Sequence, residues 1–316
     1  MLPAAAGDAS HGPPLVAILG PTASGKSALG LALAEQLGGE ILCCDSMQVY
    51  RGMNIGTAKA TASERAAIPH HLLDVVAPDE QFDAAAWAGA AGDLIVQMRG
   101  RGKLPILVGG TGLYYRALIK GLFEAPKSDP AIRARHQAEA GALGIPALHE
   151  RLRLIDPEAA AKILTGDLVR ISRALEVYEQ TGTPISELRR QKAMTTPRRR
   201  VFAIILDFSL ASLRTAIAAR VDAMMAAGFL DEVKALREAG YAGARSMQAL
   251  GYKQLGQYLD GALGLEAAVA EVKTATAAYA RRQRTWFRRE EAQMRAFEPL
   301  VPEALVHLLG GWLAPD

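Results

Sequence analysis

One short segment near the N-terminus, residues 20–27, limits most strongly what this 316-residue chain can fold into. Its sequence, GPTASGKS, matches the pattern G-x4-G-K-[ST] in full, with an apolar run before it and a helical pattern after it. Glycines let backbone amides curl around a diphosphate, a helix N-terminus adds positive potential, and a lysine neutralises charge. We therefore predict a phosphate-binding loop made of Gly20, Pro21, Thr22, Ala23, Ser24, Gly25, Lys26 and Ser27, with the Ser27 hydroxyl as a ligand for Mg²⁺.

The apolar runs of the chain predict an α/β fold. Runs at 15–19, 40–44, 104–108 and 201–206 have the character of buried strands, and helical stretches at 27–37 and 84–99 lie between them. This alternation predicts a P-loop NTPase-like core with a parallel sheet and helices on both faces. Ligands of such sheets bind beyond the carboxyl ends of the strands, and the 20–27 loop, Asp45 and Thr111 all follow strand ends.

The pattern changes between residues 126 and 200, where helical signals replace strand-like runs. We predict an all-helical insertion domain there, interrupting a core formed by 15–125 and 201–316, with the stretch 210–296 again helical. Residues 1–14 contain no lysine or arginine and no apolar centre, so we expect a short disordered lead rather than a targeting peptide. No apolar run approaches the roughly 20 residues that a membrane span requires, so we expect no membrane partner.

Charge and cysteine content bear on the kind of partner and on the redox state of the compartment. The net charge is only +3, but the first 120 residues carry 9 basic and 10 acidic side chains and the remainder 27 and 23. The excess in the second part, gathered at 189–192, 198–200 and 281–289, weakly favours a polyanionic partner. The two cysteines, Cys43 and Cys44, are adjacent and lack metal-type spacing, which predicts strand packing and fits a reducing cytoplasm.

Asp45, directly after the second predicted strand, has three possible uses. It could hold Mg²⁺, accept a proton from a nucleophile, or cap the following turn. Most chains with such a phosphate loop act on the γ-phosphate of ATP, so a kinase is the first alternative. The chain lacks the apolar run ending in Asp-Glu that an ATPase is expected to show, and its third predicted strand ends in Gly109-Gly110-Thr111-Gly112, as though a ligand approaches the backbone there.

Taken together, these segments resemble the tRNA dimethylallyltransferase (tRNA isopentenyltransferase) family over residues 20–289. The resemblance rests on the phosphate loop, on DSMQVYRGM at 45–53 with IGTAK at 55–59, on PHHL at 69–72, on LVGGTGLY at 107–114, on RALEVY at 173–178 with TG at 181–182, and on GYKQ at 251–254. It implies transfer of a dimethylallyl group from dimethylallyl diphosphate to N6 of the adenosine 3′-adjacent to the anticodon in tRNA, with release of diphosphate and with Mg²⁺ as cofactor. A cytoplasmic monomer is expected.

The resemblance also implies residue roles. Asp45 would take a proton from the amine, Thr111 would lie near the reacting centre, and Arg220 would help to bind the diphosphate. The tRNA anticodon stem-loop would contact Asp45, Ser46, Met47, Gln48, Thr111, Arg133, Gly166, Asp167, Leu168, Val169, Arg170, Gln248, Ala249, Leu250, Gly251, Tyr252 and Lys253. Two positions depart from the family pattern: Gly166 stands where many relatives carry Asn, and Lys253 stands where Arg is usual.

Several features of the sequence admit more than one interpretation. Arg281, Arg284 and Arg288 share one helix face and could grip RNA phosphates. His70-His71 lacks a third metal ligand at useful spacing, which favours a structural role. The alternatives to tRNA prenylation are a small-molecule kinase, a non-catalytic RNA-binding protein switched by nucleotide, and an isopentenyltransferase acting on free adenine nucleotides. The long helical insertion argues against the last, because a nucleotide-sized acceptor needs no such grip.

Overall fold

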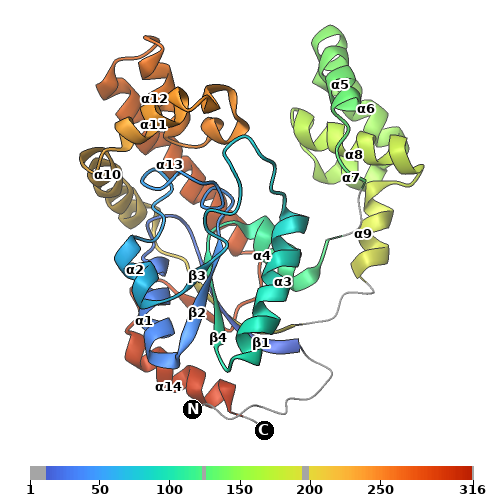
Figure 1. Ribbon diagram of the computed structural model, residues 1–316. Coiled ribbons are helices and arrows are strands. Elements are labelled where there is room, and N and C mark those ends of the chain that lie inside the picture. The colour runs from blue at the N-terminus through green and yellow to red at the C-terminus, as the bar shows by residue number, and fades with distance from the viewer. Residues whose placement is uncertain (1–11, 123–125, 194–198, 315–316) are drawn as a thin grey trace. The chain divides into compact units, whose positions relative to one another are not determined.

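A computed structural model describes residues 12–122, 126–193 and 199–314 of the chain (Figure 1). The chain divides into two compact units, one formed by Met1–Ile119 with Arg198–Asp316 and the other by Lys120–Pro197. We describe each unit by itself. None of the described helices is long and apolar enough to cross a membrane.

The first unit is built on a six-stranded sheet in which every described pair of neighbours is parallel. The strands are β1 (Gly12–Leu19), β2 (Gly39–Cys44), β3 (His70–His71), β4 (Leu104–Gly109), β5 (Arg199–Leu206) and β6 (Met294–Ala296), in the order β3-β2-β4-β1-β5-β6. The predicted P-loop NTPase-like α/β class is confirmed. Because β1 lies between β4 and β5, the loop that follows it opens at the middle of the sheet.

Three boundaries differ from those that the sequence predicts. β1 begins at Gly12, so residues 12–14 belong to a strand rather than to a disordered lead, whose other residues lie outside the described part. Pro13 and Pro14 are tolerated because they stand at the start of the strand, where its register with β5 is irregular. β5 begins at Arg199, inside the predicted insertion, and β6 interrupts the stretch 210–296 that was expected to be helical.

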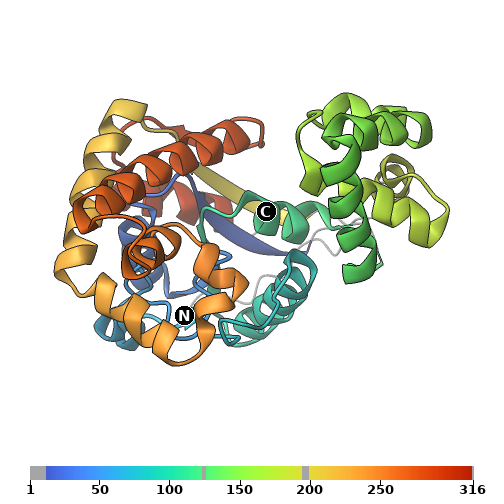
Figure 2. The same cartoon turned by 90° about the horizontal axis from the view of Figure 1, so that it is seen from above.

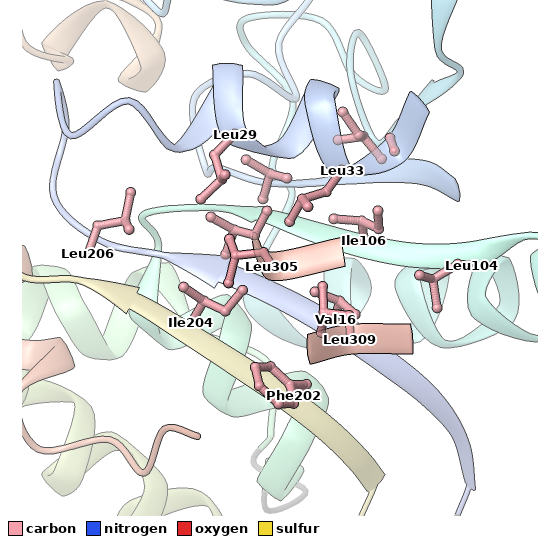
Figure 3. Close-up of a cluster of buried hydrophobic side chains, with 14 of the residues drawn as sticks. Val16, Leu29, Leu33, Leu104, Ile106, Phe202, Ile204, Leu206, Leu305 and Leu309 are labelled. Atoms are coloured by element: carbon pink, nitrogen blue, oxygen red, sulfur yellow. The ribbon is translucent and has the colours of Figure 1, made fainter. Parts of the chain in front are cut away.

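Helices cover both faces of the sheet, as Figure 1 shows with α1 and α3 on opposite sides of it. Leu29 and Leu33 of α1, together with Leu305 and Leu309 of α14, pack onto one face of the strands (Figure 3). The remaining helices of this unit include the pair α10 and α13, which pack side by side (Figure 2). The helix bounds are α1 (Lys26–Leu37), α2 (Ala62–Ala67), α3 (Ala84–Gly100), α4 (Gly112–Lys120), α10 (Leu210–Ala226), α11 (Phe229–Glu238), η1 (Tyr241–Gly243), η2 (Arg245–Gln248), α12 (Tyr252–Leu259), α13 (Leu265–Phe287) and α14 (Pro302–Leu313).

The described residues of the second unit are helical, without a strand. Its helices are α5 (Pro130–Leu143), α6 (Ile145–Ile155), α7 (Pro157–Lys162), α8 (Leu168–Thr181) and α9 (Ile185–Ala193). Asp129, Asp156 and Asp167 cap the N-termini of α5, α7 and α8, because each carboxylate accepts a backbone amide of the first turn. Apolar residues such as Leu148, Leu152 and Leu175 form a core that this unit has to itself.

Candidate active site

The loop between β1 and α1 has the backbone of a phosphate cradle. Ala23 (φ 62°) and Gly25 (φ 80°) adopt left-handed conformations that turn the chain into the helix. Gly25 is the N-cap of α1 and supplies no side chain to the first amides, which leaves the helix terminus to an anion. Ser24 Oγ and Lys26 Nζ both donate to the carbonyl of Pro21, at 2.8 and 2.9 Å, and so hold the loop in its curled form.

Two cations lie close together at this loop, one of them supplied by the loop itself. Lys26 and Arg220, from α10, line the same cavity. Burial, and then the charge of Arg220, lower the pKa of Lys26 to about 8. Burial also lowers the pKa of Arg220, and the charge of nearby Asp45 opposes that shift. A diphosphate would relieve the repulsion between the two cations, so this part of the cavity favours a polyanion.

The segments that carry Asp45 and Thr111 lie side by side because β2 and β4 are neighbours in the sheet. The amides of Gly110 and Thr111 donate to Cys44 O at 3.1 Å, and the amide of Ser46 donates to Thr111 Oγ1 at 3.0 Å. Asp45 Oδ1 accepts the amide of Met47 at 2.8 Å, so Asp45 does cap the turn. Its Oδ2 accepts no hydrogen bond from the described residues, which leaves one carboxylate oxygen available for a proton or a metal.

The cavity has a volume of about 490 Å³ and joins the phosphate loop to Asp45. Twelve of the predicted site residues line it: Thr22, Lys26, Ser27, Asp45, Ser46, Met47, Gln48, Arg220, Gln248, Ala249, Leu250 and Tyr252. Thr111, Gly251 and Lys253 belong to the same unit but not to the lining; Thr111 acts on the site through Ser46. The structure therefore brings the predicted phosphate, base and acceptor segments of this unit to one cavity.

Residues 54–59, four of which line the cavity, are held by Glu232, Gln48 and Lys59; of these three, only Gln48 was expected to have a role at the site. Glu232, on α11, accepts the amides of Asn54, Ile55 and Gly56 at 2.8, 2.7 and 3.1 Å. Gln48 Nε2 donates to the carbonyls of Thr57 and Ala58 at 3.0 and 3.2 Å, which turns its Oε1 away from those carbonyls. The fully buried ammonium of Lys59 donates to Tyr50 O, Asn54 Oδ1 and Asp74 Oδ1.

Comparison with known proteins gives the family. The sequence model of the IPP transferase family matches residues 48–290, and that of the isopentenyl transferase family matches residues 13–74. The chain belongs to the IPP transferase family. A tRNA dimethylallyltransferase from Anaeromyxobacter sp. (strain K) is 50% identical over 292 residues, covering 92% of this chain and 95% of the relative. One from Symbiobacterium thermophilum is 48% identical over 300 residues, covering 91% and 94%.

Solved structures of similar proteins agree with this assignment. The tRNA isopentenylpyrophosphate transferase from Bacillus halodurans is 40% identical with a TM-score of 0.69, covering 95% of this chain and 96% of that one. A eukaryotic dimethylallyltransferase caught acting on tRNA is 28% identical with a TM-score of 0.76, covering 90% and 74%.

Some of the residues of the helical unit that were predicted to contact RNA form ion pairs or helix caps within this IPP transferase chain. Asp167 caps α8, and its Oδ2 pairs with Arg170 at 2.9 Å, so these two side chains stabilise the helix start. Val169 is 76% exposed and Gly166 is also exposed, while Leu168 packs against the core of the unit. Arg133 lies 3.5 Å from the buried carboxylate of Glu176, which also pairs with Arg173 at 2.7 Å.

Two of the three arginines of α13 that were expected to contact RNA pair with an acidic residue of the same chain instead. Arg284 and Arg288 both pair with Asp207, a side chain only 5% exposed at the end of β5, and the Arg288 pair measures 3.0 Å. Of the three arginines expected to face RNA, only Arg281 has no acidic partner among the described residues. In this IPP transferase, α13 uses two of them to attach itself to the sheet.

Basic and histidine clusters elsewhere in the core also have internal partners. Arg199 Nε donates to Leu118 O, and Arg200 donates to Trp312 O at 2.7 Å and lies over its ring. His71 Nε2 lies 2.8 Å from Glu40 Oε2, which agrees with a structural interpretation of His70-His71.

Proposed function

We propose that this IPP transferase moves the dimethylallyl group of dimethylallyl diphosphate to N6 of the adenosine 3′-adjacent to the anticodon in tRNA. The observation that carries the proposal is one cavity lined by Lys26 of the phosphate loop, by Arg220 of α10 and by Asp45, which follows β2. A cation pair for a leaving diphosphate and a carboxylate for an incoming amine are what such a transfer needs.

In the proposed step, the bond between C1 of the dimethylallyl group and the diphosphate oxygen breaks, and its electron pair leaves with the diphosphate. The N6 lone pair forms the new bond to C1, and the N6 proton passes to Asp45. The loop amides, Lys26 and Arg220 stabilise the charge that develops on the leaving group. A neutral exocyclic amine needs proton removal but no strong base, so a carboxylate is sufficient.

The site residues fit a Mg²⁺ ion that binds with the diphosphate. Ser27 lines the cavity at the phosphate loop and offers a hydroxyl oxygen, and the diphosphate oxygens would complete a shell of the oxygen ligands that Mg²⁺ prefers. The described residues contain no group of three or more His, Cys, Asp or Glu side chains able to hold a metal alone. Bound there, Mg²⁺ would supply further positive charge to the diphosphate oxygens.

We further propose that residues 45–48 and 248–253 form the acceptor side of the site, and that the helical unit contacts the anticodon stem-loop through Arg133 and residues 166–170. An anticodon-loop base costs less to extrude than a paired one, which suits a reaction inside a cavity. The exposed positions Gly166, Val169 and Arg170 are available for such contact.

The test is transfer of label from dimethylallyl diphosphate, labelled in its five-carbon group, to an anticodon stem-loop. Digestion to nucleosides should place the label on N6-substituted adenosine, and a stem-loop with guanosine at that position should stay unlabelled. Parallel incubations with AMP and with γ-labelled ATP test the two alternatives. Label in AMP but not in RNA, or phosphate transfer from ATP, would overturn the proposal.

A further inference from the structure

Gln283 on α13 joins two loops that the proposed reaction needs. Its Oε1 accepts the amide of Thr22, in the phosphate loop, at 2.8 Å, and its Nε2 donates to the carbonyl of Gly110, after β4, at 2.9 Å. The residue is only 6% exposed. One buried amide therefore spans the carboxyl ends of β1 and β4, with both its oxygen and its nitrogen satisfied.

The Gln283 amide approaches Gly110 so closely that only a glycine fits there. A Cβ added at Gly110 would lie 2.2 Å from Gln283 Nε2, so the glycine makes room for the amide. A buried hydrogen bond at such a position is costly to lose, because the remaining partner is left without one.

From Gly110 the connection continues to Asp45. The next residue, Thr111, bonds to the end of β2 through its amide and holds the Ser46 amide through its hydroxyl. Ser46 directly follows Asp45. The loop that cradles the diphosphate and the segment that carries the carboxylate are thus tied through Gln283 and Thr111.

α13 is itself fixed where Gln283 lies. The next residue, Arg284, pairs with Asp207 at the end of β5, and Arg288 pairs with the same carboxylate. The guanidinium carbon of Arg116 lies over the Trp286 ring, 4.4 Å from the centre of that ring. The C-terminal part of α13 therefore gives Gln283 a rigid support.

We infer that Gln283 is a positioning residue for the transfer step, an inference that rests on the proposed function. It sets the spacing between the diphosphate cradle and the carboxylate that receives the amine proton. Misplacement of reacting groups by about 1 Å can cost about 10²-fold in rate. Loss of Gln283 should therefore reduce the rate of transfer rather than the affinity for tRNA.

The first variant is Gln283→Met, which keeps the length of the side chain and removes both hydrogen bonds. At saturating donor and stem-loop, its single-turnover rate should fall by about 10- to 100-fold, while its stem-loop Kd stays within about twofold of wild type. Thr285→Ala is the matched control, since Thr285 is an exposed residue of the same helix and its hydroxyl donates only to Arg281 O of that helix. It should react at the wild-type rate.

A second variant, Gln283→Glu, separates positioning from packing and remains informative if the Met variant does not fold. A protonated carboxyl can accept from Thr22 and donate to Gly110, whereas an ionised one turns an oxygen toward the Gly110 carbonyl. The ratio of its single-turnover rate to that of wild type should rise as pH is lowered from about 8 to about 6. Taking the ratio removes the titration of groups that both proteins share.

Three outcomes would overturn the inference. The Gln283→Met variant could transfer at the wild-type rate, or it could lose stem-loop affinity in proportion to its loss of rate. The ratio of the Gln283→Glu rate to the wild-type rate could also stay constant as pH changes. These outcomes differ from failure of the proposed function, in which the wild-type protein itself would transfer no label.

Discussion

The phenol of Tyr252 donates to Glu232 Oε1 at 2.6 Å, which ties the start of α12 to α11. The same carboxylate holds the amides of residues 54–56, so one acidic side chain fixes two segments of the cavity wall. Tyr252 is 1% exposed, and burial and the adjacent carboxylate raise its pKa. Tyr252, expected to contact tRNA, thus has a clear structural task.

Tyr252→Phe should lower the free energy of unfolding by about 1.5–3 kcal/mol, the usual contribution of a hydrogen bond to a charged group. Urea unfolding measures it. Tyr258→Phe on the same helix is the control, because the Tyr258 hydroxyl has no hydrogen-bond partner among the described residues; its change should stay within about 0.5 kcal/mol. Equal losses in the two variants would show that the Glu232 bond contributes nothing.

Lys26→Ala should reduce transfer by at least about 10²-fold, because it removes a fixed charge facing the leaving group. Stem-loop affinity should hardly change, since the lysine belongs to the diphosphate end of the cavity. Single-turnover kinetics and a stem-loop titration measure both. Near-normal turnover would mean that the donor does not bind at this loop.

Donor affinity should depend on pH through Lys26. Its pKa is lowered to about 8, and a diphosphate binds the protonated form better. Affinity should therefore be highest below pH 8 and fall as pH rises through that value, by up to about tenfold per unit. Calorimetric titration with a non-reacting diphosphate analogue measures the slope. The Lys26→Ala variant should lack it, and a wild-type affinity that stays constant across this range would contradict the assignment.

Asp45→Asn separates a base from a metal ligand. If Asp45 accepts the amine proton, the single-turnover rate should fall by about 10²–10⁴-fold while donor Kd barely moves. Donor Kd and rate are measured on the same preparation over a range of Mg²⁺ concentrations. A weakened donor Kd with rescue by high Mg²⁺ would assign Asp45 to the metal instead.

Replacing both Arg284 and Arg288 by Gln should destabilise the protein by about 3–5 kcal/mol, because Asp207 would keep a buried charge without a partner. Arg281→Gln should leave stability unchanged and, if Arg281 contacts RNA, reduce the salt dependence of stem-loop binding. Thermal unfolding and binding at several salt concentrations distinguish these effects. A stable double variant would show that the Asp207 pairs do not anchor α13.

Local patterns allowed much of the core to be predicted. The phosphate loop and the four longer strands each leave a signal within a few residues, through turn chemistry or apolar periodicity. β3 and β6 have two and three residues, too few for a periodic pattern, and they exist because a neighbouring strand offers hydrogen bonds.

The sequence by itself determined the fold class, the phosphate loop and the strand-end position of Asp45, because spacing along the chain encodes them directly. Only the tertiary structure decided which partners the polar side chains meet. The spacing of Arg281, Arg284 and Arg288 correctly placed them on one helix face, but Asp207, 77 residues from Arg284, decided that two of them face the sheet. Gln283 bonds to residues 261 and 173 positions away. Periodicity shows which side of a helix is buried, whereas the identity of a partner depends on which strand ends the fold brings beside it.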